Sequence, residues 1–226
     1  FDGVEVTEAG LREGVFFART LFADWDGRNP VFADVRRAAV TNLAIQYESD
    51  MAHVEHVARL SLQMFDSLTE QGVIQPLSGE RELLWAGAML HDVGMTIAYD
   101  DHHKHSQYLI LSAELPGFDP RERALIACIA RYHRKGIPKL GELAPVAQPK
   151  DEDLIARCAV IVRLAEHLER GRDQAVSQVL LRSDGDEIQL HVAAPSESVA
   201  LPHWSVDRYG DGETFARVFG RKLMIA

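Results

Sequence analysis

Helix-start signals recur through residues 29–171, and they restrict this part of the chain mainly to helices. An Asn, Asp or Ser side chain caps the free N–H groups of a first helical turn, and proline fits within that turn. Such signals lie at Asn29-Pro30, Asp50, Ser78, Asp119-Pro120 and Asp151. With apolar residues at helical spacing, they predict helices over 31–47, 51–71, 79–94, 120–133 and 151–170, with a surface loop over 136–149.

A different pattern begins after Gly171. Two segments are strand-like, 175–182 and 187–193, and Ser183-Asp184-Gly185-Asp186 between them indicates a hairpin. Further along, residues 212–219 are helical in pattern and 221–225 extended. The end of the chain is therefore expected to form a small sheet with a helix against it.

The length and composition allow one main core. A chain of 226 residues with 46% hydrophobic content can form one domain with a small appendage. We expect a mainly α protein, a helical bundle with a small C-terminal α+β appendage. The predicted divisions are a linker strand and helix over 1–28, a helical domain over 29–172 and an α+β subdomain over 173–226.

The charge and the apolar pattern exclude several classes of protein. A formal net charge of −10 argues against general binding to nucleic acid or to an anionic membrane, so any anion site must be focused. No apolar run approaches the ~20 residues that span a bilayer. Cys128 and Cys158 lie in apolar stretches without disulfide or CxxC spacing. We expect a cytoplasmic protein with buried thiols.

A histidine beside a carboxylate, His91-Asp92, stands at the end of one predicted helix. This pair is suited to hold a divalent metal. On the 51–71 helix His53 falls at the edge of the apolar face, whereas His56 is predicted to be solvated. On the 151–170 helix Glu166 falls at the edge of the apolar face and His167 points nearly opposite.

These residues predict a site with two imidazoles and two carboxylates. The candidate metal ligands are His53, His91, Asp92 and Glu166, a mixed set that suits Mn, Fe, Zn or Mg. The alternative is that Glu166 is an ordinary helix-edge residue and His53 a hydrogen-bonded histidine at the edge of the core. The joint occurrence of all four favours the metal site.

Basic and histidine residues gather in two further segments, Asp100–Ser106 and Arg131–Lys135. In an acidic chain they predict a compact anion site, with phosphate as the natural ligand. His105 and His133 would hold a second metal or protonate a leaving oxygen. The candidates to bind the substrate are His103, Lys104, Arg131 and Arg134, with Lys135 beside them. The alternative is a solvated loop and a basic helix end favoured by the helix dipole.

Several of these segments resemble the C-terminal half of the exopolyphosphatase/guanosine-pentaphosphatase (Ppx/GppA) family, a half with the HD-domain helical fold. The resemblance covers nearly the whole chain. Its motifs are Gly10-Leu11-Arg12-Glu13-Gly14, His91-Asp92-Val93-Gly94, His103-Lys104-His105-Ser106, Glu114-Leu115-Pro116-Gly117-Phe118 and Arg131-Tyr132-His133-Arg134.

The resemblance implies roles for individual residues. The HD pattern of a His, a His-Asp pair and a distant Asp maps onto His53, His91-Asp92 and Glu166. Glu166 has a longer side chain than the Asp of the pattern, and this would change the geometry of metal binding. His105 and His133 match second-metal positions of some HD phosphohydrolases, and Tyr132 stands where those often have another His. The family's own hydrolysis is attributed to N-terminal actin-like domains, whose phosphate loops this chain lacks.

Two functions remain open at this point. The first is a metal-dependent phosphohydrolase for polyphosphate or nucleotide phosphates, with Asp92, His105 and His133 as catalytic residues. The second is a non-catalytic module that binds polyphosphate and forms a dimer within a longer exopolyphosphatase; the Gly10-Leu11-Arg12-Glu13-Gly14 segment and the start at Phe1 rather than Met favour it. The homodimer is implied by the resemblance alone. A purely structural helical scaffold would leave the interior histidines and carboxylates unexplained.

Overall fold

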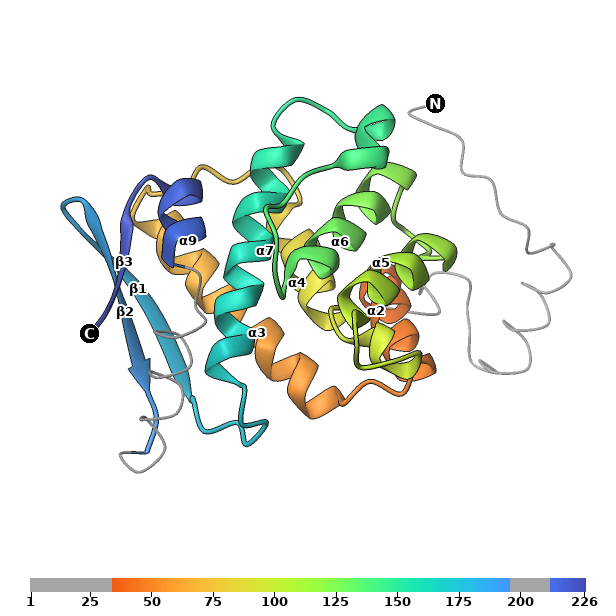
Figure 1. The fold of residues 1–226 in the computed structure, drawn as a ribbon, viewed down its shortest axis with the longest axis horizontal. Coiled ribbons are helices and arrows are strands. Elements are labelled where there is room, and N and C mark those ends of the chain that lie inside the picture. Colours follow the sequence, from red (N-terminus) through yellow and green to blue (C-terminus); the bar gives the residue numbers. More distant parts are fainter. Residues whose placement is uncertain (1–33, 196–211) are drawn as a thin grey trace, which may run out of the picture.

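Helices form the body of the protein and a small sheet lies at one end. The computed structural model describes residues 34–195 and 212–226 (Figure 1). The linker strand and helix predicted over 1–28, and the Asn29-Pro30 cap, fall outside these residues. Within the described residues, each helix is too short or too polar to cross a bilayer. The prediction of a mainly α fold with a small C-terminal sheet is confirmed.

Six of the described α-helices lie near predicted ones, whereas the α-helix over 102–112 and the two 3-10 helices were not predicted. In chain order the helices are α2 Val35–Gln46, α3 Met51–Glu70, α4 Glu80–Met89, the 3-10 helix η1 Val93–Thr96, α5 His102–Ser112, α6 Pro120–Tyr132, the 3-10 helix η2 Gly141–Val146, α7 Asp151–Leu168 and α9 Gly212–Phe219. Two predicted caps are confirmed. Asp50 accepts a hydrogen bond from the His53 N–H at 3.2 Å, and Asp119 forms a capping box with Glu122.

Two predicted boundaries are wrong for local reasons. The helix expected over 79–94 is capped by Gly79, which has a φ of 77°, and not by Ser78. It ends at Met89, because His91 and Asp92 lie in the turn that leads into η1. The short α4 therefore places this pair just beyond a helix end and not within the last turn of a helix.

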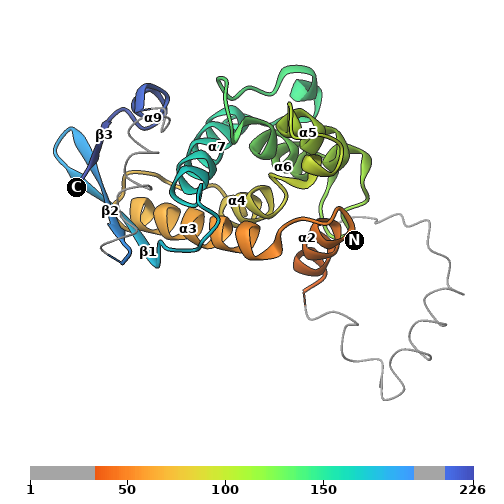
Figure 2. The same ribbon diagram turned by 60° about the horizontal axis from the view of Figure 1, so that its bottom comes forward.

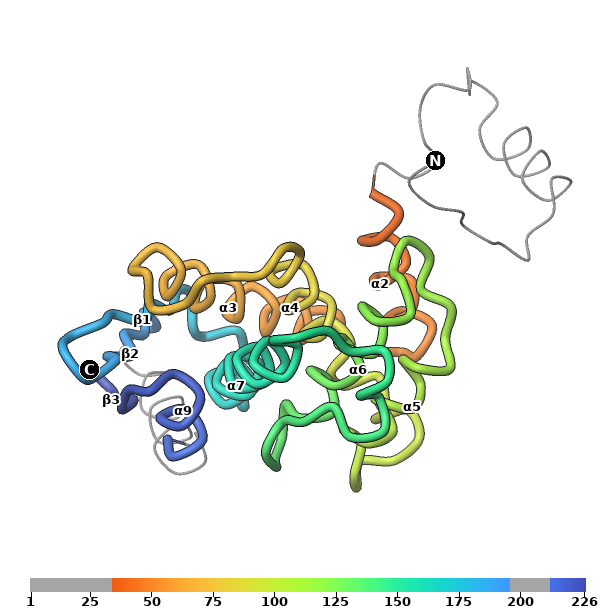
Figure 3. Tube along the Cα trace, turned by 90° about the horizontal axis from the view of Figure 1, so that it is seen from above, coloured from red at the N-terminus to blue at the C-terminus, as the bar shows by residue number. Residues whose placement is uncertain are grey.

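The sheet contains a hairpin and one parallel strand. β1 (Gln178–Asp184) pairs antiparallel with β2 (Glu187–Ala193), as predicted, although β1 begins later than expected. β3 (Lys222–Ile225) runs parallel to β2, in the order β1-β2-β3. The sheet lies at one end of the molecule and α2 and α5 at the other (Figures 1 and 3).

The edge strand β1 is covered by a polar stripe on α3. The N–H groups of alternate strand residues donate to α3 side chains one helical turn apart: Val179 to Gln63 at 3.0 Å, Leu181 to Ser67 at 3.2 Å and Ser183 to Gln71 at 2.8 Å. Two residues of a strand and one turn of a helix both span about 6 Å, so the two repeats match. This contact satisfies the strand edge and fixes the sheet on α3.

The central helix α7 is buried nearly all round, because α3, α4, α6 and α9 all pack against it. The expectation that His167 points away from the core is therefore wrong, since its side chain is 8% exposed. His56 is also buried, contrary to prediction. Arg59 beside it donates to the carbonyls of Val176 and Ser177, so the chain leading into β1 covers this face of α3.

An ion pair joins the first turns of α6 and α7. Arg121 donates two hydrogen bonds to the buried Asp151, at 2.8 and 2.5 Å, and the Gln148 N–H donates a third at 2.7 Å. Burial alone would raise the pKa of Asp151, but these hydrogen bonds outweigh burial and hold it below its ordinary value. The pair ties together the two helices whose other ends reach His133 and Glu166.

Asp151→Asn should therefore lower stability by roughly 1.5–3 kcal/mol at pH 7, the range for hydrogen bonds to charged groups. Because the folded pKa is depressed, this contribution is present above the unfolded pKa of about 3.9 and is lost as pH falls through the folded pKa. Urea unfolding at pH 7 and pH 3 tests this. The difference in free energy of unfolding between wild type and Asp151→Asn should be smaller at pH 3 than at pH 7. The matched control is Asp153→Asn, at an exposed position, which should change the free energy of unfolding by less than about 0.5 kcal/mol.

Candidate metal centre

Five buried residues from four parts of the chain converge inside the helical body. Figure 2 shows α3, α4, α5, α6 and α7 packed around this region. Exposed fractions are 6% or less for all five: His53 on α3, His91 and Asp92 after α4, His102 at the start of α5, and His133 at the end of α6. Burying this many polar side chains is costly unless they are paired or hold a ligand.

The first group consists of His53, His91 and Asp92, with Glu166 beside them. Glu166 Oε2 lies 3.0 Å from His53 Nε2 and 3.3 Å from His91 Nε2. The Asp92 carboxylate lies 3.9 Å from His53 Nε2 and 3.6 Å from His91 Nε2. Ligand atoms about 2.1 Å from a shared ion are separated by roughly 3.0–3.4 Å at right or tetrahedral angles. The Glu166 spacings fall in this range, and the Asp92 oxygens lie up to about 0.5 Å beyond it.

The first group also contains poorly oriented polar atoms. His53 Nε2 and His91 Nε2 are buried and lie 3.0 and 3.3 Å from Glu166 Oε2, but these atoms form no well-aligned hydrogen bond among the described residues. Buried polar atoms in native proteins are almost always satisfied, and a bound ion can satisfy those that lack a hydrogen bond. The four residues therefore fit a divalent metal by both donor type and spacing.

A second group shares one residue with the first. It consists of Asp92, His102 and His133. His102 Nε2 lies 3.3 Å from Asp92 Oδ1 and 3.2 Å from His133 Nε2. His133 Nε2 lies 4.0 Å from the same Asp92 oxygen. Asp92 thus stands between two sets of histidines, an arrangement that could hold two ions bridged by one carboxylate.

Three of the histidines are oriented in the same way. The Nδ1–H group of His91 donates to the Ala88 carbonyl at 2.6 Å, that of His102 to Tyr99 at 2.9 Å and that of His133 to Ala130 at 2.7 Å. In each case the carbonyl lies three residues earlier in the chain. These hydrogen bonds fix the ring and leave Nε2 to face Asp92, the usual support for a metal-binding histidine.

The turn that carries His91 and Asp92 is held against α5. Ser106 donates to the His91 carbonyl at 2.6 Å and accepts from the Gly94 N–H at 2.9 Å. A Cβ on Gly94 would lie 2.2 Å from the His102 carbonyl oxygen and 2.3 Å from the Ser106 nitrogen. Only glycine allows this approach, which brings His102 next to Asp92.

The charges within the cluster are strongly coupled. Burial lowers the pKa of His91, but the carboxylates of Asp92 and Glu166 outweigh it and raise the pKa to about 9. Burial and the neighbouring His91 lower the pKa of His133 to about 3. In the metal-free chain His91 therefore holds the proton that balances the carboxylates. A metal would take the place of this proton, so metal binding should strengthen as pH rises.

The structure brings together most of the predicted ligands. His53, His91, Asp92 and Glu166 lie in one group, and His133 reaches the same carboxylate from α6. His105 is half-buried and belongs to neither group of described residues; His102 stands beside His133 instead. Sequence reasoning missed His102 because it treated 100–106 as a segment between helices. The signal was the helical spacing of the buried His102, Ser106, Leu109 and Ile110.

The predicted anion-binding residues separate into buried and exposed groups. His103 is fully buried and its pKa is lowered to about 4 by burial and by nearby Arg131, so it is neutral near pH 7. Lys104 is exposed and lies 2.6 Å from Asp101, while Lys135 lies 3.8 Å from the same carboxylate. Arg134 is exposed and stacks over the Tyr99 ring at 5.3 Å. The exposed cations border the second group.

Comparison with known proteins places these residues in a family context. Residues 35–206 match the family model described as Ppx/GppA phosphatase, domain III. The guanosine-5'-triphosphate,3'-diphosphate pyrophosphatase of Pseudoalteromonas translucida is 30% identical over 139 residues, 62% of this chain and 27% of the relative. Proteins of the same name from Vibrio vulnificus and Vibrio parahaemolyticus are 27% and 26% identical over 194 residues, 85% of this chain and 37% of each relative. The chain spans about a third of the length of these curated relatives.

Proposed function

Because this chain belongs to the Ppx/GppA phosphatase family, of which it matches domain III, we propose that its buried cluster is the active site of a metal-dependent phosphohydrolase. The proposed substrates are polyphosphate or nucleotide phosphates. The main support for the proposal is a set of buried donor atoms, His53 Nε2, His91 Nε2 and Glu166 Oε2, packed beside the Asp92 carboxylate, which also meets a second pair of histidines.

The proposed metal ligands are His53, His91, Asp92 and Glu166, with His102 and His133 holding a second ion through Asp92. A divalent metal in such a site supplies an activated water and stabilises charge on a phosphoryl group. His133 would have no nitrogen left for acid catalysis, because its Nδ1–H donates to the Ala130 carbonyl and its Nε2 would hold the second ion. The half-buried His105, on the same turn of α5 as His102, is therefore the proposed proton donor to the leaving oxygen.

Substrate binding is proposed for four cations beside the second group, of which Arg131 is half-buried and the other three are exposed. Lys104, Arg131, Arg134 and Lys135 would neutralise phosphoryl charge. The Asp101 carboxylate holds Lys104 and Lys135 on this face of the protein. His103, though predicted from sequence to bind substrate, is fully buried and would reach an anion only if its neighbours moved.

His91→Ala should remove metal and hydrolysis together, because it deletes an Nε2 atom of the first group. Elemental analysis of the chain loaded with Mn²⁺ should give about one to two equivalents in the wild type and fewer in the variant. Hydrolysis of polyphosphate and of a nucleoside triphosphate should fall to background. His191→Ala on β2, outside both groups, is the matched control and should keep the wild-type metal content. Hydrolysis that survives chelation or the substitution would contradict the proposal.

The second candidate function is a polyphosphate-binding and dimerising module of a longer protein. It is favoured by the short span of the chain, about a third of relatives named for hydrolysis. The same experiment separates the two functions. If neither wild type nor His91→Ala retains metal after addition of Mn²⁺ or Mg²⁺, and charge reversal of Lys104 and Arg131 weakens polyphosphate binding, the binding module is the better description.

A further inference from the structure

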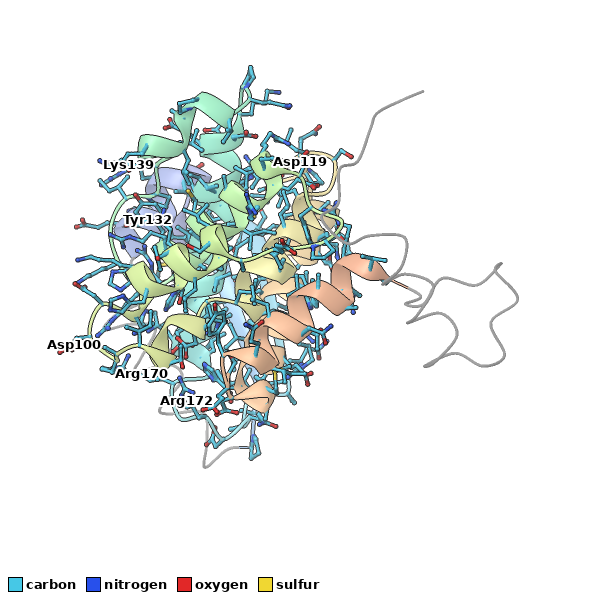
Figure 4. All side chains as sticks on the ribbon, turned by 90° about the vertical axis from the view of Figure 1, so that its right-hand side faces the viewer. Asp100, Asp119, Tyr132, Lys139, Arg170 and Arg172 are labelled. Atoms are coloured by element: carbon cyan, nitrogen blue, oxygen red, sulfur yellow. The ribbon has the colours of Figure 1, made fainter. Side chains whose placement is uncertain are left out.

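Arg172, in the turn after α7, reaches back to the first metal-binding group. Its Nη2 atom donates to Asp92 Oδ2 at 2.7 Å, and its Nη1 atom lies 3.5 Å from Asp50 Oδ2 at the cap of α3. Figure 4 shows Arg172 and its neighbour Arg170 at the same edge of the molecule. Arg172 therefore contacts two of the segments that carry the first group and comes from a turn that follows the third.

The two oxygens of Asp92 face different neighbours. Oδ1 lies within 4.0 Å of His91, His102 and His133. Oδ2 lies 3.9 Å from His53 Nε2 and is the oxygen that Arg172 occupies. An ion held with His53 would draw on Oδ2, whereas an ion held with His102 and His133 would draw on Oδ1. Arg172 thus donates to the Asp92 oxygen that lies nearer His53.

Arg172 is more exposed to solvent than the carboxylate to which it donates. Its side chain is 36% exposed, whereas that of Asp92 is 6% exposed. Its backbone φ of 53° lies in the left-handed region, which costs free energy for a residue with a Cβ and persists where the surroundings require it. A guanidinium group matches the oxygens of a phosphoryl group better than any other side chain does. Arg172 can therefore exchange a buried carboxylate for an anion from solvent.

We propose that Arg172 binds a phosphoryl oxygen at the mouth of the site, and that it occupies Asp92 Oδ2 when metal and anion are absent. This inference rests on the proposed function, because it assumes an ion held by His53, His91 and Asp92. Arg172 then opposes binding of the metal alone and favours binding of metal and anion together. The two ligands should raise each other's affinity by the same factor.

Calorimetric titration of Mn²⁺ into the chelator-stripped chain tests the first half of the inference. Arg172→Gln should bind Mn²⁺ about tenfold more tightly than wild type, as expected for loss of one charge-assisted contact that competes with the metal. The increase in Mn²⁺ affinity should appear in the binding of the ion that His53 helps to hold, which is the binding that His53→Ala abolishes. Arg170→Gln removes the same charge from the same turn, and it should stay within about twofold of wild type, because among the described residues the arginine that donates to Asp92 is Arg172 and screening weakens a charge that does not touch this carboxylate.

Repeating the titration in millimolar inorganic phosphate tests the second half. Phosphate should raise the Mn²⁺ affinity of wild type and of Arg170→Gln several-fold, and leave Arg172→Gln unchanged. Equal Mn²⁺ affinities in Arg172→Gln and Arg170→Gln, or phosphate coupling that survives in Arg172→Gln, would overturn the inference. If Mn²⁺ binding is lost in His91→Ala yet insensitive to Arg172, only this inference fails. If no variant binds Mn²⁺, the proposed function fails with it.

Discussion

Asp92→Asn should remove metal from both groups at once, whereas His53→Ala or His133→Ala should remove it from one. The reason is that Asp92 is the residue common to the two sets of possible ligands. An amide nitrogen cannot coordinate, and the neutral side chain no longer balances a divalent charge. Because partners that merely orient a ligand are worth about 10–100-fold in metal affinity, loss of the shared ligand should cost more than about 100-fold.

Elemental analysis and Mn²⁺ calorimetry on the three variants would measure this difference. Asp101→Asn is the matched control, because Asp101 is a partly exposed carboxylate on the same face that pairs with Lys104. It should retain the full metal content. If Asp92→Asn kept one equivalent with unchanged affinity, the two groups would not share this carboxylate, and the proposed arrangement of two ions around it would be wrong.

Gly94→Ala should both destabilise the protein and disable the second group. A Cβ at this position would lie 2.2 Å from the His102 carbonyl oxygen and 2.3 Å from the Ser106 nitrogen. Both are backbone atoms of α5, so the helix itself must move. Overpacking of this kind costs roughly 3 kcal/mol, equivalent to a fall in melting temperature of about 10 °C for a chain of this size.

The displacement of α5 also has a functional readout. Moving the start of the helix takes His102 away from Asp92 and breaks the hydrogen bond from the Gly94 N–H to Ser106. Both the melting temperature from thermal unfolding and the Mn²⁺ affinity from titration should therefore fall in Gly94→Ala. Gly212→Ala meets no atom within 4 Å and should stay within about 0.5 kcal/mol of wild type. A melting temperature for Gly94→Ala equal to that of Gly212→Ala would show that α5 is not held as described.

Local signals in the sequence predicted most of the elements. Caps such as Asp50 and Asp119 act within one helical turn, and the 184–187 hairpin depends on residues next to each other, so these features need no knowledge of distant contacts. The family resemblance is confirmed by the match over 35–206. The phase of α3 and α7 also placed His53 and Glu166 at the edges of their buried faces, where the structure brings them within 3.0 Å of each other.

Where local signals are weak, the predictions are less accurate. The start of α5 follows Asp101, which has a φ of 55° and makes no side-chain cap. Asp101 is a residue type that often caps helices, but its side chain does not cap α5, and the segment was assigned to the region between helices. The prediction therefore falls on His105 in place of His102. The predicted cap of α4, Ser78, is also wrong. This helix begins after Gly79, whose left-handed backbone conformation is not signalled by a capping side chain.

The sequence by its local patterns predicted most of the helices, the candidate ligands His53, His91, Asp92 and Glu166, and the family that the chain resembles, because these patterns depend on neighbours along the chain. Only the tertiary structure decided that His56 and His167 are buried, since their faces are covered by segments distant in sequence. It also brought Asp92 into both groups and placed Arg172 where it donates to one of the Asp92 oxygens. Residues 80 positions apart meet there only because α4 and α7 pack together, a contact that no local pattern encodes.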